Sequence, residues 1–395
     1  MSHPLSAEEL VKHVQALAQG VGPRPTGHAA EAVAQEYVRD ILDALGFAAI
    51  EEIPFATWDT WGYATVTPNV VSLLGGVLGK LGAVGRLLSG VLSLSSSYHL
   101  LKSSDCSKQP FAFLYPNQKQ TKNLLARVPA AGERLHRVVL VGHTDTNKHR
   151  QTFAPGMKRF IPLLDTLNIL FPFAHGVAQV AGALGAGEKV AWLRKASALG
   201  MLVSLGLLLS DELEGYVEGA NDNATAVAAL LGLAAYLKEH PLQHTEVWFA
   251  FTSAEEVGCV GMHKLLDEYG HVLNNAYFID FEMVGCQEIA YITDHSSFSY
   301  LTGYKPDSES VRLAEKTARN HPQLGVNGRS MVIGEEVGAL RGRDYRGICL
   351  AGVGDDGWLA NWHQYSDHFD NIQPAGIERA ARFALAMMQE LDAQN

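Results

Sequence analysis

The chain has 395 residues, of which 47% are hydrophobic and 18% are charged, and its formal net charge is −11. That length suits one large α/β domain with insertions, and the apolar fraction is high enough for a sizeable core, which excludes wholesale disorder. The acidic balance argues against a nucleic-acid partner, because phosphate binding needs a basic surface. The four cysteines match no zinc-ribbon or redox spacing, which indicates reduced thiols and not a disulfide framework.

The first 47 residues predict two helices separated by a turn. Ser6 is a plausible N-cap, and apolar residues recur at helical spacing through Leu17. Residues 20–27 (GVGPRPTG) form a turn, and a second helix runs from about residue 29 to residue 45. The chain opens with an acidic amphipathic helix and not with a charged-then-apolar export signal, so we expect a cytoplasmic protein.

Further along the chain, apolar runs alternate with helical patterns. Continuous apolar runs of this kind are typical of strands that are covered on both faces, and their alternation with helices indicates a three-layer α/β/α fold with a central mixed, mostly parallel sheet. In such sheets ligands gather beyond the carboxyl ends of the strands. The expected strands are 137–142, 245–252, 276–281 and 347–352, and the clearest helices between them are 224–238 and 377–391.

Two apolar stretches do not follow this alternation, at about residues 69–103 and 157–212. The second stretch ends in residues 196–210, which carry no charge but are fewer than the roughly 20 residues that a spanning helix needs. We expect one domain over residues 1–395 in which both stretches are helical hairpins, packed together as a cap beside the site. The alternative is a membrane-embedded or interfacial hairpin, with peripheral membrane contact through these insertions.

Polar fragments follow several of the apolar runs. His143 emerges at a strand end, where its ring could bind a metal, and Asp145 returns to the same face and could steady the site. Asp222 opens a helix and could bridge two ions. Taken alone, each has a more ordinary explanation, because a strand-end histidine is usually a satisfied polar residue and an aspartate at a helix start is usually a cap.

The sharpest fragment is the pair Glu255 and Glu256, because adjacent ionised carboxylates at the end of a buried strand need partners. The natural division gives one glutamate to a metal and leaves the other to move protons. Asp280 and Glu282 have the same strand parity, and spacing alone does not choose between them. His363 lies in a stretch that, taken alone, would be interpreted as a polar surface loop. Histidine nitrogens and carboxylate oxygens are ligands for zinc, and a hydrolytic site keeps one position open for water.

Together and in this order, the fragments resemble the co-catalytic zinc aminopeptidase family, which includes bacterial leucyl aminopeptidases, glutamate carboxypeptidase and the glutaminyl cyclases. The resemblance runs from the family-like opening at residues 22–27 (GPRPTG) to Ile377 and covers most of the chain apart from the two apolar stretches. The chain departs from the family at two places outside the implied ligand positions. The fragment that follows the bridging aspartate ends in Thr225-Ala226 where the family has Ser-Gly, and 78 residues separate His143 from Asp222, where compact members have far fewer.

The resemblance implies a role for each fragment. The histidine of the H-x-D fragment, His143, binds one zinc, and its aspartate, Asp145, lies behind it. The aspartate of the G-A-x-D-N fragment, Asp222, bridges both ions. Of the glutamate pair, Glu255 is the general base and Glu256 is a ligand. A D-M-[IV]-G fragment supplies the next ligand in the family, and its first position is Glu282 here, a longer carboxylate. The last fragment, H-x-x-x-D-x-x-D-N, selects His363, which Asp367 and Asp370 follow, and not His368. The implied residues are His143, Asp145, Asp222, Glu255, Glu256, Glu282 and His363.

The resemblance therefore implies a zinc-dependent exopeptidase, an aminopeptidase acting on short peptides, with two Zn²⁺ per chain. His143 and Glu282 would hold one ion, Glu256 and His363 the other, with Asp222 between them, while Glu255 moves the proton. One alternative keeps the site but changes the reaction, to carboxypeptidase action or hydrolysis of a non-peptide amide. The other is a metal-free, membrane-associated binding protein on the same fold.

Overall fold

One mixed sheet of eight strands forms the centre of the computed structural model, which describes residues 3–115, 118–296 and 298–394. The strands are β1 Glu51–Thr57, β2 Lys119–Val128, β3 His136–His143, β4 Thr245–Thr252, β5 Tyr277–Glu282, β6 Glu288–Ser296, β7 Asn327–Val332 and β8 Arg346–Val353. Their order across the sheet is β1-β2-β4-β3-β5-β8-β6-β7. The pairs β3–β4, β3–β5, β5–β8 and β6–β7 are parallel, and β1–β2, β2–β4 and β6–β8 are antiparallel. The predicted mixed, mostly parallel sheet is confirmed.

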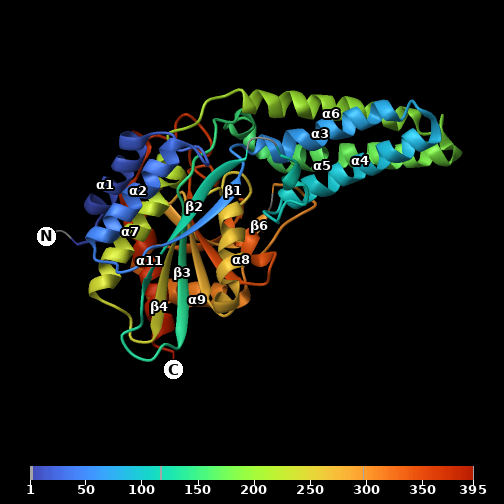
Figure 1. The fold of residues 1–395 in the computed structure, drawn as a ribbon. Helices are drawn as coiled ribbons and strands as arrows, with labels where there is room; N and C mark the ends of the chain where they lie inside the picture. The colour runs from blue at the N-terminus through green and yellow to red at the C-terminus, as the bar shows by residue number, and fades with distance from the viewer. Residues whose placement is uncertain (1–2, 116–117, 297, 395) are drawn as a thin grey trace.

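Helices cover both faces of this sheet, which gives the expected three layers (Figure 1). One face is covered by α1 Ala7–Gln15, α2 Ala29–Ala44, α7 Thr225–Glu239, α9 Ser308–Asn320 and α11 Pro374–Asp392, and the other by α8 Val260–Leu273 and α10 Glu336–Arg341. Side chains of β3 alternate between the two layers, because successive residues of a strand point to opposite faces. Val138 and Leu140 join the core under α7 and α11, whereas Val139 and Val141 join the core under α8 and α10.

The four strands expected from apolar runs are present as β3, β4, β5 and β8, with ends that differ by at most one residue from the predicted ones. The two N-terminal helices are also present, and the Ser6 side chain accepts a hydrogen bond from the Glu9 amide as an N-cap. The sequence patterns did not reveal β1, β2, β6 and β7, which pair at the two edges of the sheet. The outermost strands β1 and β7 bury only part of their side chains, as the burial of β7 at Met331 alone illustrates, so these two lack a continuous buried apolar run.

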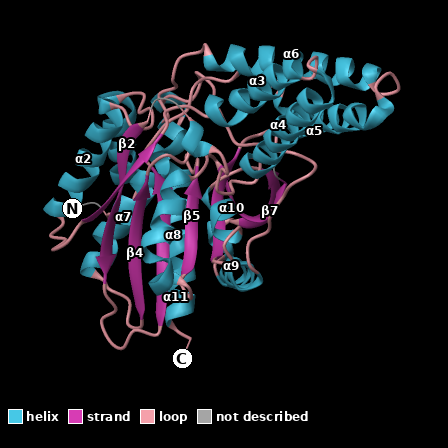
Figure 2. Cartoon of the chain, turned by 45° about the vertical axis from the view of Figure 1, so that its right-hand side comes forward, coloured by secondary structure: helices cyan, strands magenta, loops and turns pink. Residues whose placement is uncertain are grey.

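The two apolar stretches form four long helices, α3 Gly62–Leu78, α4 Gly82–Ser103, α5 Ile161–Ala181 and α6 Ala191–Glu212. The two hairpins pack against each other, as expected. They make an elongated bundle, here called the arm, that projects from one end of the α/β body (Figures 1 and 2). The first hairpin begins at residue 62 and not at residue 69, because α3 continues through Pro68.

Candidate active site

The predicted site residues come from five separate segments that meet at the carboxyl ends of the central strands. His143 is the last residue of β3, Glu282 is the last residue of β5, and Glu255 and Glu256 follow the end of β4. β3 lies between β4 and β5, and all three run parallel, so their carboxyl ends meet. Asp222 lies in an irregular turn before α7, and His363 lies in the loop after β8.

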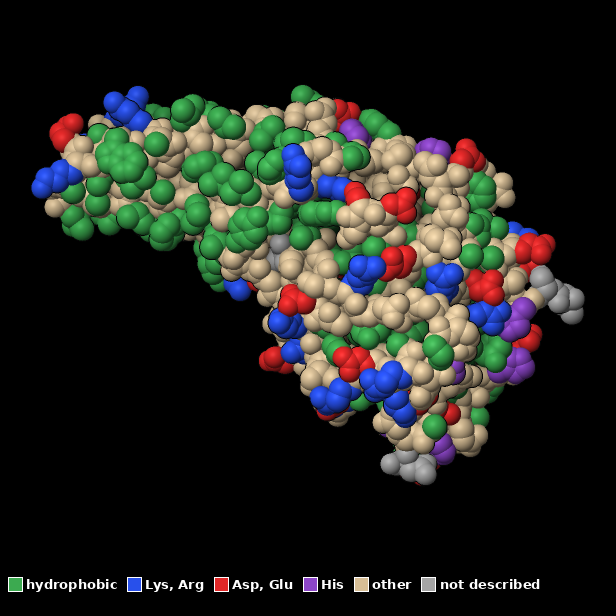
Figure 3. Space-filling model, turned by 180° about the vertical axis from the view of Figure 1, so that it is seen from behind, with side chains coloured by type: hydrophobic (Ala, Val, Ile, Leu, Met, Phe, Trp, Pro, Cys, Tyr) green, Lys and Arg blue, Asp and Glu red, His purple; other side chains and the backbone are tan. Residues whose placement is uncertain are grey.

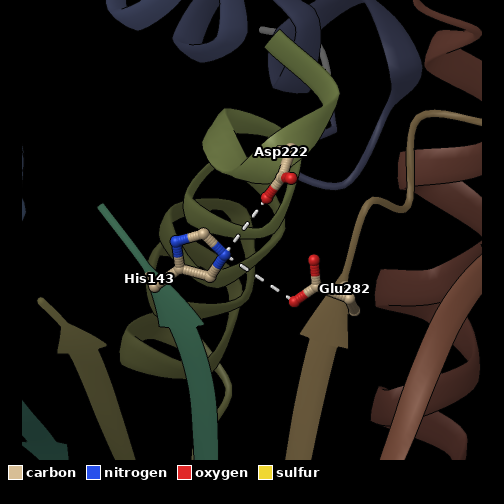
Figure 4. Close-up of side chains that lie close together, drawn as sticks. All are labelled: His143, Asp222 and Glu282. Atoms are coloured by element: carbon tan, nitrogen blue, oxygen red, sulfur yellow. Dashed lines mark ion pairs between the residues drawn. The ribbon is translucent and has the colours of Figure 1, made fainter. Parts of the chain in front are cut away.

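His143, Asp222 and Glu282 form a first group of facing ligand atoms (Figure 4). The Nε2 atom of His143 lies 3.3 Å from Oδ1 of Asp222 and 3.7 Å from Oε2 of Glu282. All three side chains are buried. The Nδ1 atom of His143 lies 3.1 Å from the backbone carbonyl oxygen of Asp145, and this contact directs Nε2 toward the carboxylates.

Asp222, Glu256 and His363 form a second group, which shares Asp222 with the first. The Nε2 atom of His363 lies 3.4 Å from Oδ2 of Asp222 and 3.1 Å from Oε2 of Glu256. Asp222 therefore turns one carboxylate oxygen to each histidine. This is the arrangement expected of a carboxylate that lies between two ions.

Glu255 lies beside both groups but is a member of neither. Its Oε2 atom is 3.9 Å from Nε2 of His143, and the side chain borders a pocket that Asp222, Glu256, Glu282 and His363 also line. The pocket opens past Trp61, which lies at the root of the arm. Glu255 is thus placed where it can reach a molecule that enters the pocket.

Asp145 organises the glutamate pair from behind. Its two carboxylate oxygens accept hydrogen bonds from the backbone amides of Glu255 and Glu256, at 3.2 Å and 3.3 Å, and from the hydroxyl of Thr26 at 2.6 Å. Thr26 belongs to the predicted turn at residues 20–27, so this turn is part of the site's support. The sequence predicts this turn but not its role in supporting the site.

Arg24, in the same turn, links the loop after β3 to the segment before Asp222. Its buried guanidinium donates to the carbonyl oxygens of Thr144 at 3.0 Å and Gly219 at 2.7 Å. Gly219 has a φ of +65°, and a Cβ atom there would lie 2.1 Å from the Thr146 side chain. Burial lowers the pKa of Arg24 to about 10, although Asp367, Asp145 and Asp222 oppose the shift.

Asp367 holds the backbone that carries Asp222. Its carboxylate accepts the amide of Asn221 at 2.6 Å and the amide of Asp222 at 3.1 Å. On the other side, the side chain of Asn223 donates to Oε2 of Glu282 at 3.1 Å. Asp370, which follows in the same fragment, has an exposed side chain, and so does His368. The structure therefore brings His363 into the site and leaves His368 outside it.

The concentration of acidic groups controls the protonation of the site. Burial, followed by the Glu256 carboxylate, raises the pKa of Asp222, and burial raises the pKa of Glu256 to about 7 and that of Glu282 to about 8. Burial also lowers the pKa of His363 to about 3. Burial opposes protonation of His143 as well, but its carboxylate neighbours outweigh that effect and raise its pKa well above the usual value.

The donor set fits a divalent metal. Four buried polar atoms of the candidate ligand residues have no hydrogen-bond partner: Nε2 of His143, Oδ2 of Asp222, Oε1 of Glu256 and Nδ1 of His363. Buried polar atoms without partners are costly, and the first two of these face into the shared cluster. Histidine nitrogen and carboxylate oxygen are the ligands of catalytic zinc sites, and a cation would offset the repulsion among the carboxylates.

Asp280 does not join either group. It lies on β5 two residues before Glu282, and it groups with Glu335 and Cys349 in the buried layer behind the site. Burial, and then the carboxylates of Glu336 and Glu335, raise its pKa well above the usual value. Of the two carboxylates between which spacing did not choose, Glu282 is the one whose side chain faces His143.

Two features of the site escaped sequence reasoning. Asn147 donates a hydrogen bond to Oε2 of Glu256 at 2.7 Å, and it lies with Asp145 in the loop that follows His143. The pocket also has an aromatic wall formed by Trp61, Phe298 and Trp362. Phe298 stacks on Trp362 and lies tilted against Trp61, with ring centroids 5.6 Å apart in each pair. Only Trp362 has a local signal, its position next to His363.

Comparison with known proteins supports one family. Residues 206–388 match the model of peptidase family M28. No curated protein matches the chain by sequence. Among solved structures, a zinc-dependent exopeptidase from Parabacteroides distasonis shares the fold at a TM-score of 0.55 and 14% identity, covering 99% of both chains.

Two further solved structures share the fold. A leucine aminopeptidase precursor from Bacteroides thetaiotaomicron has a TM-score of 0.55 at 13% identity, covering 98% of this chain and 97% of that one. A glutaminyl cyclase from Fimbriiglobus ruber has a TM-score of 0.56 at 16% identity, covering 99% and 97%. Residues 206–388 thus resemble peptidase family M28, and the whole chain shares the fold of zinc-dependent exopeptidases, aminopeptidases and glutaminyl cyclases, which agrees with the resemblance that the sequence motifs predict.

Proposed function

We propose that the chain is a zinc-dependent aminopeptidase that binds two zinc ions and hydrolyses short peptides. The observation that carries the proposal is the position of Asp222, whose two carboxylate oxygens face His143 and His363 separately. His143 and Glu282 would complete one ion site, and Glu256 and His363 the other. Zinc in such a cluster polarises the scissile carbonyl and lowers the pKa of a water molecule.

Glu255 is the proposed general base. It borders the pocket and is not needed to complete either ligand group around Asp222. Burial and the neighbouring Glu256 and Glu282 raise its pKa well above the usual value, although His143 opposes the shift, so it can hold a proton and release it. Glu255 takes a proton from the attacking water and gives it to the leaving amine. Asp145 positions this step through the Glu255 amide.

The lining of the pocket favours the amino end of a peptide over the carboxyl end. Of the described residues that line it, none is Lys or Arg, whereas four are acidic. Binding of a substrate carboxylate needs a cationic side chain, and the described lining of this pocket supplies none. Arg150, a buried guanidinium at the root of the arm, donates to Asn147 at 3.0 Å and to Glu212 at 3.0 Å.

An apolar side chain on the substrate suits the wall of this pocket. Trp61 and Phe298 also line a second, mainly apolar pocket at the root of the arm, between α3, α5 and α6. A substrate side chain that leaves the catalytic pocket on this side would contact aromatic and aliphatic groups. We therefore expect a preference for apolar residues at the amino terminus.

A second candidate reaction uses the same residues. The fold is shared with a glutaminyl cyclase, and Glu255 could equally move a proton from the amine of an amino-terminal glutamine to departing ammonia. The presence of His143 and Glu282 opposite Asp222 favours the two-ion hydrolase, because it provides a complete second set of ligands.

Replacement of Glu255 by Gln should lower kcat by about a hundred- to ten-thousand-fold while zinc remains bound. Gln keeps the size of the side chain but cannot accept the proton from water. Peptide hydrolysis and the zinc content of the same preparation are the two measurements. Unchanged turnover in a zinc-loaded variant would refute the assignment of Glu255 as the base.

A panel of substrates should separate the candidate reactions. We expect hydrolysis of leucyl and phenylalanyl amides with a free amine, and a loss of at least tenfold in kcat/KM when the amine is acetylated, because acetylation removes the free amino terminus that an aminopeptidase site accommodates. Peptides with amino-terminal glutamine, and peptides blocked at the amino end, complete the panel. Faster release of ammonia from glutaminyl peptides than of the second residue would favour cyclisation, and cleavage of blocked peptides alone would favour a carboxypeptidase.

Asp367→Asn should weaken zinc binding by about ten- to a hundredfold, because an amide group cannot accept both backbone N–H groups that hold Asp222 in place. Asp370→Asn is the matched control three residues away, with a side chain that is 80% exposed. Competition with a zinc chelator measures both affinities. Equal zinc affinity in the two variants would show that Asp367 does not position Asp222.

The metal-free chain should lose stability as the pH rises from about 6.5 to about 8.5. The folded chain raises the pKa of Glu256 to about 7 and of Glu282 to about 8, so it binds protons in this window that the unfolded chain has released. The contribution of these two groups to the free energy of unfolding is complete below about pH 4.5 and is lost as the pH rises through their raised pKa values. His363, with its pKa lowered to about 3, adds no slope above about 6.5.

Thermal unfolding of chelator-treated protein measures this slope, and Glu282→Gln should reduce it. The stabilisation by added zinc should grow over the same range, because zinc binds the deprotonated carboxylates. A metal-free protein that becomes more stable across this window would contradict the proposed protonation of the cluster.

A further inference from the structure

The surface of the arm is apolar along most of its length. Figure 3 shows hydrophobic side chains over its visible face, with charged groups gathered at its free end. Each of the four helices contributes large exposed side chains, so the apolar surface surrounds the bundle and is not confined to one side. They include Leu74 and Val77 on α3, Leu87, Leu88 and Val91 on α4, Leu170, Phe173 and Val177 on α5, and Leu199, Leu202 and Val203 on α6.

The interior of the arm is polar. The side chain of Asn69 on α3 donates to Asn168 on α5 at 2.8 Å, and the hydroxyls of Ser72 and Ser93 bond at 2.7 Å between α3 and α4. The hydroxyl of Ser97 on α4 donates to a backbone carbonyl of α5 at 2.9 Å. These groups are buried inside the bundle, where a water-soluble bundle would place leucines.

Glycines bring the arm helices into close contact. A Cβ atom at Gly90 on α4 would lie 2.6 Å from Val180, and one at Gly176 on α5 would lie 2.8 Å from Leu94. Small residues at helix contacts and hydrogen bonds between helices are the means by which helices associate in lipid, where apolar side chains gain nothing by burial against each other.

The α/β body shows the opposite pattern. Helix α1 buries Leu10 and Val14, and α7 buries an almost uninterrupted run of alanines and leucines. In the arm, only 11% of the most apolar 18 residues of α6 are buried, so this helix is not the core helix of a soluble bundle. The inversion of inside and outside is thus confined to the arm.

Charge along the arm is limited to its two ends. Residues 62–79, 87–101, 166–187 and 196–210 contain no Asp, Glu, Lys or Arg. A helix of 22 residues, such as α4 or α6, is roughly 33 Å long, close to the ~30 Å of a bilayer's hydrocarbon. The free end carries Lys80, Arg86, Lys189, Arg194 and Lys195 against Glu188 alone, and long basic side chains there can reach phosphate headgroups.

We propose that the arm inserts into the hydrocarbon core of a lipid bilayer. A second copy of the chain would cover one side of the bundle, whereas the exposed apolar side chains lie on the outward faces of all four helices. Two segments, Lys158–Ala186 and Ala191–Glu212, are long and apolar enough to cross a membrane by length and composition. The catalytic pocket borders the arm at Trp61 and Ser103, which places it at the membrane surface.

A single labelled cysteine tests the insertion in the full-length chain. The four native cysteines are buried, so a thiol-reactive NBD dye can be directed to Leu202→Cys on α6 or to Val33→Cys on α2. The two positions are matched, with side chains 54% and 56% exposed. In vesicles of phosphatidylcholine and phosphatidylglycerol, the emission of the Leu202→Cys label should shift to shorter wavelength and be quenched by lipids brominated in their chains. The Val33→Cys label should remain quenched by aqueous iodide.

A Leu202→Cys label that stays accessible to iodide in the presence of vesicles would overturn the proposal. A blue shift without vesicles, accompanied by a dimer in size-exclusion chromatography, would overturn it in favour of a second copy of the chain.

Charged substitutions provide an independent measurement. The triple variant Leu199→Glu/Leu202→Lys/Val203→Glu should lose flotation with the same vesicles several-fold, because charges at these positions would have to enter hydrocarbon. The control Val33→Glu/Leu135→Lys/Val272→Glu changes three exposed apolar residues of the α/β body and should float as the unmodified chain does. Undiminished flotation of the arm variant would contradict insertion. Neither readout depends on peptidase activity, so failure of the proposed function would leave this result unaffected.

Discussion

The repulsion among buried carboxylates at one edge of the sheet is the constraint to which the rest of the site responds. Asp145, Asp222, Glu255, Glu256 and Glu282 lie together around two imidazoles at the catalytic pocket. Burial raises the pKa values of Asp222, Glu255, Glu256 and Glu282, and neighbouring charges of the same sign add to these shifts. A divalent cation reverses the sign of the local field. Binding of such a cation would offset the cost of the cluster and would make the metal part of the proposed stable state of the protein.

The supporting contacts explain how the cluster keeps its shape before any cation binds. Backbone amides hold the two supporting carboxylates in place, because Asp145 accepts the amides of the glutamate pair and Asp367 accepts those of Asn221 and Asp222, while the buried Arg24 guanidinium interacts electrostatically with both. Backbone donors fix the positions of the ligands without competing with a metal for them. Three residues with positive φ, Ala254, Met283 and His363, adjoin or belong to the ligand set. Strained backbone of this kind persists where surrounding contacts over-determine it, and it is common at functional sites.

The sequence revealed the residues of the site more fully than the shape of the molecule. The strands that carry His143 and Glu282 each contain an apolar run, so both their position and their polar ends could be predicted. Convergence of five distant segments could be predicted only through the family resemblance, because no local pattern encodes that β3 lies between β4 and β5. The roles of Arg24 and Thr26 are also non-local, since each acts on a loop more than a hundred residues away. The choice of Glu282 over Asp280 required the direction of a side chain, which strand parity cannot give.

The arm shows why composition alone left two interpretations open. Apolar helices satisfy the requirements of a soluble cap and of a lipid-exposed bundle equally well, and the difference lies in which residues face outward. A soluble bundle would turn Leu202 inward and Ser72 outward, because burial of leucine in water gains free energy and burial of a hydroxyl costs it. The observed arrangement is the reverse, with hydroxyls and amides bonded to each other inside and leucines outside. In hydrocarbon that arrangement is the favourable one, because unpaired polar groups cannot face lipid and leucine can. If the arm inserts as proposed, the α/β body and the arm follow one rule in two different solvents.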